Sequence, residues 1–223
     1  MKKNIITVGR QFGSGGRTIA KIVAERLEIP YYDKEIVEKV ALETGFSEEY
    51  IEQIGEHARG KSVWSYAFSN PGVPGIMGGM SASDFLWVIQ RKVILDLAEK
   101  GPCVIVGRCA DRILKDREDV LRVFIHASDE FRAERIVRLY GESESKPQKR
   151  LADKDAKRRA HYKHYTGEEW GDTTNYHMCL DSGVLGIEKC AEYIVSAMKD
   201  EQNKPEPPIL SGVICMLNDL GYH

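Results

Sequence analysis

The stretch that decides the fold is GRQFGSGGRTIA, residues 9–20. It follows the apolar run Ile5–Val8, which reads as a short strand. Beyond it, apolar residues recur at the spacing of one helix face, at Ile19, Ile22, Val23 and Leu27. The first 27 residues therefore predict a strand, a glycine turn and a helix, in that order.

The glycine turn resembles a Walker-type phosphate-binding loop in part. Such a loop needs backbone N–H groups that close around phosphate oxygens, a lysine, and a Ser or Thr near a metal ion. The backbone cradle would come from Gly13, Ser14, Gly15 and Gly16, and the hydroxyl from Thr18. Gly16 occupies the lysine position, and Arg17 is the cation that follows it. Taken alone, the loop fits a nucleotide site, another phosphate site, or a plain turn.

Composition narrows the class of protein. A chain of 223 residues, 42% hydrophobic and 30% charged, can bury one core with an insertion. Its net charge of -2 disfavours a nucleic-acid or anionic-membrane surface. The sequence shows neither a secretory leader nor a long apolar run, so we expect a cytoplasmic protein with no membrane contact.

Strand-like apolar runs alternate with amphipathic helices along the chain, which predicts a parallel sheet built from βαβ units. The predicted strands are residues 4–8, 30–32, 103–106, 121–126 and 177–180. A helix over 84–99 is expected to bury a stripe through Phe85, Val88, Ile89, Val93 and Leu97, and Ser128 is expected to cap the next helix. Together these elements predict an α/β fold, a three-layer sandwich.

Several stretches lie outside the sandwich pattern. We assign residues 1–200 to one domain, with an acceptor-binding or cover insertion at about 45–83, rich in Gly, Pro and aromatic residues. The basic segment at about 143–172 is either a solvated charged face or a lid whose arginines reach phosphates. Residues 201–223 read as a linker and C-terminal tail.

Six blocks in order resemble the cytidylate kinase-like family, relatives of the bacterial cytidylate kinases within the nucleoside monophosphate kinases. They are GSGGRTIAKIVAERL, YYDKEIV, VIVGRCADRIL, LRVFIHASDEFRAERIV, RRAHYKHYTGEEWGD and LDSGVLGIEKCAEYI. The resemblance covers residues 4 to about 198 and implies a P-loop kinase fold.

On the donor side, the resemblance implies that residues 13–18 bind ATP, with Mg²⁺ at Thr18. Cytidylate kinases carry the loop Gly-Ser-Gly-Lys-Gly-Thr, so Gly16 replaces the lysine and Arg17 replaces the next glycine. Our hypothesis is that Arg17 supplies the missing charge as a catalytic cation. Arg10 precedes the cradle and is expected to point away from a phosphate bound there.

On the acceptor side, the resemblance implies that Arg108 contacts a monophosphate, as in the Gly-Arg-Asp segment of cytidylate kinases. Cys109 stands where that segment has its aspartate. Asp33 and Asp111 are further candidates for substrate binding. Alternatively, Asp33 caps the helix that follows it, and Asp111 is a charge on a helix surface.

In the basic segment, Arg158 and Arg159 are the candidates for the charge that stabilises the phosphoryl transition state, and spacing alone does not decide which points inward. The sequence thus favours a kinase that moves the γ-phosphoryl group of ATP, with Mg²⁺, to a nucleoside monophosphate such as CMP or dCMP. The alternatives are a nucleotide-binding sensor or interaction protein without turnover, or a kinase of another small molecule. We expect a monomer or a homodimer.

Overall fold

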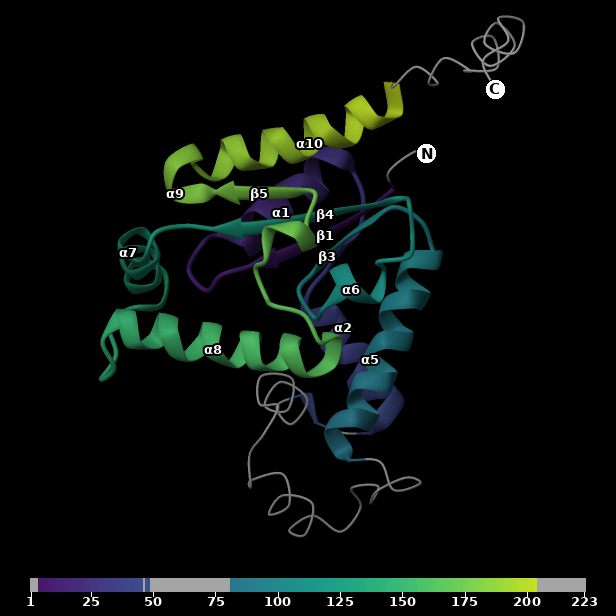
Figure 1. Cartoon of the computed structure of the whole chain (residues 1–223), viewed down its shortest axis with the longest axis horizontal. Helices are drawn as coiled ribbons and strands as arrows, with labels where there is room; N and C mark the ends of the chain where they lie inside the picture. The colour runs from purple at the N-terminus through teal and green to yellow at the C-terminus, as the bar shows by residue number, and fades with distance from the viewer. Residues whose placement is uncertain (1–3, 46, 49–80, 204–223) are drawn as a thin grey trace, which may run out of the picture.

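The computed structural model describes residues 4–45, 47–48 and 81–203. At its centre is a sheet of five parallel strands in the order β2-β3-β1-β4-β5 (Figure 1). The strands are β1 (Ile5–Arg10), β2 (Tyr31–Tyr32), β3 (Cys103–Val106), β4 (Val120–His126) and β5 (Met178–Asp181). The predicted parallel sheet is confirmed, and every predicted strand overlaps an observed one.

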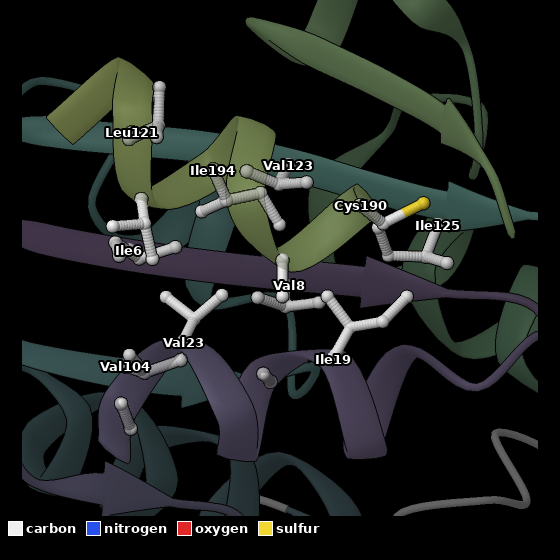
Figure 2. Close-up of a cluster of buried hydrophobic side chains, with 14 of the residues drawn as sticks. Ile6, Val8, Ile19, Val23, Val104, Leu121, Val123, Ile125, Cys190 and Ile194 are labelled. Atoms are coloured by element: carbon white, nitrogen blue, oxygen red, sulfur yellow. The ribbon is translucent and has the colours of Figure 1, made fainter. Parts of the chain in front are cut away.

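Helices cover both faces of this sheet. α1 (Gly16–Leu27) and α10 (Ile187–Asn203) pack on one face, and α2 (Lys34–Thr44), α5 (Ala82–Glu99) and α6 (Ala110–Ile113) on the other. Successive strand residues point to opposite faces, so both faces of a central strand must be apolar. Figure 2 shows Ile6 and Val8 of β1 facing α1 and α10, while Ile5 belongs to the cluster with α2 and α5. The predicted three-layer sandwich is confirmed.

Two further helices extend the chain at the carboxyl ends of the strands. α7 (Asp129–Tyr140) follows β4, and α8 (Pro147–Thr166) packs against α7 (Figure 1). The Ser128 hydroxyl accepts a hydrogen bond from the Phe131 N–H at 3.3 Å, which confirms the predicted cap. A short 3-10 turn at Thr173–Asn175 and α9 (Ser182–Leu185) lead into and out of β5.

Two details differ from the sequence-based expectations. The predicted stripe of α5 is wrong at Val88, which is 48% exposed; Leu86 and Ile94 are buried instead. The reason is that α5 packs between α2 and α6 as well as on the sheet, so helical periodicity alone does not set which face is covered. α10 continues to Asn203, into the segment predicted to be a linker. Most of the predicted insertion at 45–83 and the rest of the tail lie outside the described residues.

Candidate active site

The glycine turn joins β1 to α1. Gly13 and Gly15 have φ angles of 82° and 81°, in the left-handed region that favours glycine. A Cβ on Gly13 would lie 2.9 Å from the carbonyl oxygen of Arg132, and one on Gly15 would collide with Ile187. Both glycines are therefore required by the backbone conformation and by the elements packed around the turn.

Hydrogen bonds fasten the turn to the sheet. The Ser14 hydroxyl donates to the carbonyl oxygens of Gln11 at 2.9 Å and Ile125 at 3.1 Å, and the Ser182 hydroxyl donates to the Ser14 carbonyl at 2.6 Å. Ser14 is fully buried, so its side chain serves the loop conformation. The Ser14 side chain is therefore not available to a phosphate.

A buried ion pair holds the turn from the other side. Asp155 of α8 accepts hydrogen bonds from the Phe12 N–H at 2.8 Å and from Arg132 Nη1 at 2.6 Å. Arg132, on α7, also donates to the Phe12 carbonyl at 3.1 Å. Both ionic side chains are less than a tenth exposed. This loop clamp, made of Phe12, Arg132 and Asp155, ties the glycine turn to α7 and α8.

Two adjoining cavities open at the turn. The smaller, about 70 Å³, lies over residues 13–18, and the larger, about 350 Å³, lies at the carboxyl ends of β1 and β3. Ligands of open α/β sheets bind at this edge. The residues that line both cavities are Arg10, Phe12, Arg17 and Arg158. The smaller cavity therefore meets the larger one at a rim of arginines.

The larger cavity is strongly cationic at that rim. The charged residues that line it within the described part of the chain are Arg10, Arg17, Lys34, Arg108, Lys154, Arg158 and Asp111. Its remaining wall is aromatic and polar, with His161, Tyr162, Trp170 and Tyr176. A pocket lined by both cations and aromatic rings suits a ligand that carries phosphate on an uncharged ring system.

Arg17 and Asp33, both predicted site residues, are brought together. Arg17 Nε lies 2.6 Å from Asp33 Oδ2, and its Nη2 donates to Oδ1 at 3.3 Å. Asp33 precedes α2, yet its side chain makes no capping hydrogen bond. The alternative that Asp33 caps α2 is therefore wrong: its carboxylate faces the arginines because Arg17 and Arg10 lie on its cavity side.

Arg108 stands at the end of β3 in the larger cavity, as predicted from its place after a buried strand. Arg108 and Cys109 have φ angles of 57° and 55°, an uncommon conformation for residues with a side chain. Strain of this kind clusters at functional sites. The turn after β3 contributes Gly107, Arg108 and Cys109 to the lining of the cavity.

Asp111 is not a surface charge. It is 4% exposed and accepts a hydrogen bond from the Tyr162 hydroxyl of α8 at 2.6 Å. Burial raises the pKa of the Asp111 carboxyl above its ordinary value. The alternative that Asp111 is a helix-surface charge is wrong because α8 covers α6 at this point, a contact that only the tertiary structure creates.

The structure separates the two arginines of α8. Arg158 lines both cavities, donates to the Arg10 carbonyl at 3.1 Å and lies over the Phe12 ring. Arg159 is exposed, with its guanidinium 5.8 Å from the centre of the Trp170 ring. Arg158 is thus the inward-facing member of the pair.

Thr18, the predicted metal ligand, lines the smaller cavity. Its hydroxyl accepts a hydrogen bond from Arg135 Nη2 of α7 at 3.0 Å, which leaves one lone pair for a metal. Mg²⁺ commonly takes one or two protein oxygens and completes its shell with water and phosphate oxygens. Thr18 fits that role, and Gly13, Gly15 and Gly16 line the same cavity at the start of α1, a position that suits phosphate oxygens.

Sequence reasoning missed the importance of Arg10 and His161. The Arg10 guanidinium leaves the glycine turn, as expected, but it enters the larger cavity; burial, and then the charge of Arg158, lower its pKa to about 9. His161 lines the same cavity, and neither ring nitrogen has a hydrogen-bond partner among the described residues. Burial lowers the pKa of His161 to about 4. The position of Arg10 at the carboxyl end of β1 could have indicated a site residue, because ligands bind at that edge of such sheets. Nothing in the sequence around His161 indicated that it lies in the site.

Among the helices of the described residues, none has the length and apolar character needed to cross a membrane.

Solved structures of other proteins share this fold. A crystal structure of an uncharacterised protein from Eubacterium ventriosum has a TM-score of 0.66 and 25% identity, covering 88% of this chain and 99% of that one. The shikimate kinase of Acinetobacter baumannii shares the fold at a TM-score of 0.50 and 15% identity, over 92% of this chain and 97% of its own.

Similarity in sequence identifies the family more closely than similarity in fold does. A protein named cytidylate kinase from Aeropyrum pernix is 26% identical over 188 residues, which is 84% of this chain and 94% of that relative. The model of the cytidylate kinase-like family matches residues 5–184. The match takes in the glycine turn, β3 with Arg108, and α8, and extends through β5. The chain is thereby shown to belong to the cytidylate kinase-like family.

Proposed function

We propose that this protein moves the γ-phosphoryl group of ATP to a small phosphorylated acceptor, with CMP or dCMP as the first candidate. The observation that carries the proposal is the pair of adjoining cavities that share a rim of arginines. Phosphoryl transfer asks the protein for alignment and charge neutralisation and little covalent chemistry. A donor cavity and an acceptor cavity that meet at fixed cations supply both.

On the donor side, the triphosphate would lie on the backbone of residues 13–16 at the start of α1, where N–H groups and the helix dipole favour anions. Thr18 would hold Mg²⁺, which when bound would neutralise negative charge on the phosphates. Arg17 and Arg158 would face the transferred group from the shared rim.

On the acceptor side, Arg108 would hold the monophosphate, and the Arg17–Asp33 ion pair would fix the opposite wall. Asp111 would act through Tyr162, since its carboxylate is bonded to that hydroxyl at the cavity wall. The larger cavity, about 350 Å³, is within the range of roughly 300–1,000 Å³ typical of small-molecule sites.

We assign the segment at about 143–172 as a lid over this site. Its helix α8 contributes Arg158 and Tyr162 to the cavity walls and Asp155 to the loop clamp. Arg159, on the solvent side, would have at most an indirect role. The insertion at about 45–83 remains a proposed cover for the acceptor. The cytoplasmic location and a monomeric or homodimeric state also remain predictions.

The choice of CMP or dCMP rests on family membership and on the relative named cytidylate kinase. Cys109 is a buried residue where cytidylate kinases have an aspartate, so recognition of the base or sugar is expected to differ in detail. Other nucleoside monophosphates and small phosphorylated metabolites are therefore part of the test.

The test is a coupled assay of ADP release from ATP and Mg²⁺ over a panel of nucleoside monophosphates and other phosphorylated metabolites. Arg108→Ala should lower turnover with the accepted substrate at least tenfold. The control is Arg26→Ala, which removes an arginine from the far end of α1, where it pairs with the exposed Glu188. ATP binding without transfer to any acceptor would instead support the alternative, a nucleotide-binding protein without turnover.

A further inference from the structure

Positions 10 and 16 compete for one volume. A Cβ built on Gly16 would lie 2.5 Å from the Cβ of Arg10 and 3.0 Å from its Cγ. Gly16 itself has no left-handed backbone, so its conformation would accept any residue. The side chain of Arg10 therefore runs through the space from which a side chain at position 16 would start. Position 16 is the lysine position of the related loops.

The far end of Arg10 lies where the cavities meet. Arg10 lines both of them, its Nη2 is 3.9 Å from Asp33 Oδ1, and its guanidinium covers Gly107 so closely that a Cβ there would collide with it. The side chain is 15% exposed. Its Nε is buried and has no hydrogen-bond partner among the described residues.

The surroundings neutralise this guanidinium only in part. The Asp33 carboxylate is already engaged by Arg17 through two contacts of 2.6 and 3.3 Å, and its distance to Arg10 is longer. Arg158 approaches Arg10 through the backbone carbonyl, and adds a second positive charge nearby. A buried cation beside other cations is costly unless an anion completes the site.

We propose that Arg10 supplies the phosphate-binding cation that this loop lacks at position 16, and that Arg10 and Gly16 are an exchanged pair. The inference rests on the proposed function for its ligand, a nucleoside triphosphate. It differs from the expectation that Arg17 takes this role. Arg17 is half exposed and held on Asp33, whereas Cβ and Cγ of Arg10 lie where a side chain at position 16 would begin. The Arg10 guanidinium would contact the outer phosphates where they enter the larger cavity.

The exchange predicts a specific pattern in four variants. Arg10→Gly and the space-filling Arg10→Met remove the charge, and each should lower turnover about a hundred- to a thousandfold, the usual effect of losing one preorganised donor. Gly16→Lys alone should also be impaired, because its Cβ collides with Arg10. The double variant Arg10→Gly/Gly16→Lys restores both the space and a cation. Its turnover should be at least tenfold higher than that of Arg10→Gly.

ATP affinity, measured by calorimetry with Mg²⁺, separates this inference from the proposed function. If the wild-type protein transfers phosphate to no acceptor, the proposed function fails, and the affinities still decide about Arg10. Weaker ATP binding by at least tenfold in Arg10→Met, with recovery in the double variant, supports the exchange. Circular dichroism reports whether each variant is folded.

Three results would overturn the inference: no ATP binding by the wild-type protein, wild-type affinity and turnover in folded Arg10→Met, or a folded double variant no better than Arg10→Gly. If both single Arg10 variants fail to fold, the ATP affinity of the double variant is compared with that of the wild-type protein. Affinity within tenfold of wild type supports the exchange, and a larger loss contradicts it. Arg26→Ala again serves as the matched control, since it removes an arginine whose contact lies at the far end of α1.

Discussion

The loop clamp makes a stability prediction that can be worked out from the structure. Asp155→Asn keeps the size of the side chain and removes its charge. The amide oxygen can still accept from the Phe12 N–H, but the amide NH₂ then faces the Arg132 guanidinium, a donor against a donor. Breaking a buried ion pair by removing one partner costs about 3–5 kcal/mol.

The lower end of that range is expected here. Arg132 keeps a second carboxylate, Asp129, which is 69% exposed and therefore a weak partner. We predict a loss of about 3 kcal/mol in the free energy of unfolding, which for a chain of this size lowers Tm by about 6–12 °C. Urea unfolding followed by far-UV circular dichroism measures the loss.

Two further variants sharpen the test. Asp153→Asn removes an exposed carboxylate two residues earlier on α8 and should change stability by less than about 0.5 kcal/mol. Arg132→Met with Asp155→Leu replaces the pair by apolar side chains and should recover part of the loss, since such replacements are often neutral. A folded Asp155→Asn protein within about 1 kcal/mol of wild type would show that this ion pair does not hold the loop.

The remaining predictions concern the glycine turn, Gly107 and His161. Crystals grown in sulfate or phosphate should hold an anion on the backbone of residues 13–18, at the start of α1; a turn collapsed or filled by a side chain at high sulfate would contradict this. Gly107→Ala should cost more than the roughly 1–2 kcal/mol of a left-handed alanine, because its Cβ would also overlap the Arg10 guanidinium; a smaller loss in urea unfolding would mean that the guanidinium moves freely. The pKa of His161 falls from 6.5 to about 4 on folding, so the unfolded chain binds this proton at a higher pH than the folded chain does. The free energy of unfolding should therefore fall as pH decreases from about 6.5 to 4, by up to about 1.4 kcal/mol per pH unit. His161→Gln should remove most of that fall. The exposed His164→Gln should lessen it only slightly, because the charge of His164 is a smaller cause of the lowered pKa of His161 than burial and Arg108. Urea unfolding at several pH values measures both effects, and equal pH dependence in all three proteins would refute the assignment.

The sequence alone determined the parts of this protein that depend on near neighbours. The run from Ile5 through the glycine turn to Leu27 sets strand, turn and helix by apolar spacing and by the need for glycine at left-handed positions. The fully apolar run Cys103–Val106 predicts a strand covered on both faces, and Ser128 predicts the start of α7. These signals act within a few residues, so they can be read without knowing the rest of the fold.

Only the tertiary structure decided how the site residues are used. Asp33 pairs with Arg17 and leaves α2 without a side-chain cap, Asp111 is buried under Tyr162, and Arg158 faces inward while Arg159 faces solvent. Each outcome depends on a partner from another element, and the loop clamp joins Phe12 to a residue 143 positions away. A side chain's partner is chosen by packing across the sheet and between helices, which adjacent residues do not encode. The competition between Arg10 and Gly16 for one volume is of the same kind, because it exists only once β1 and α1 are folded against each other.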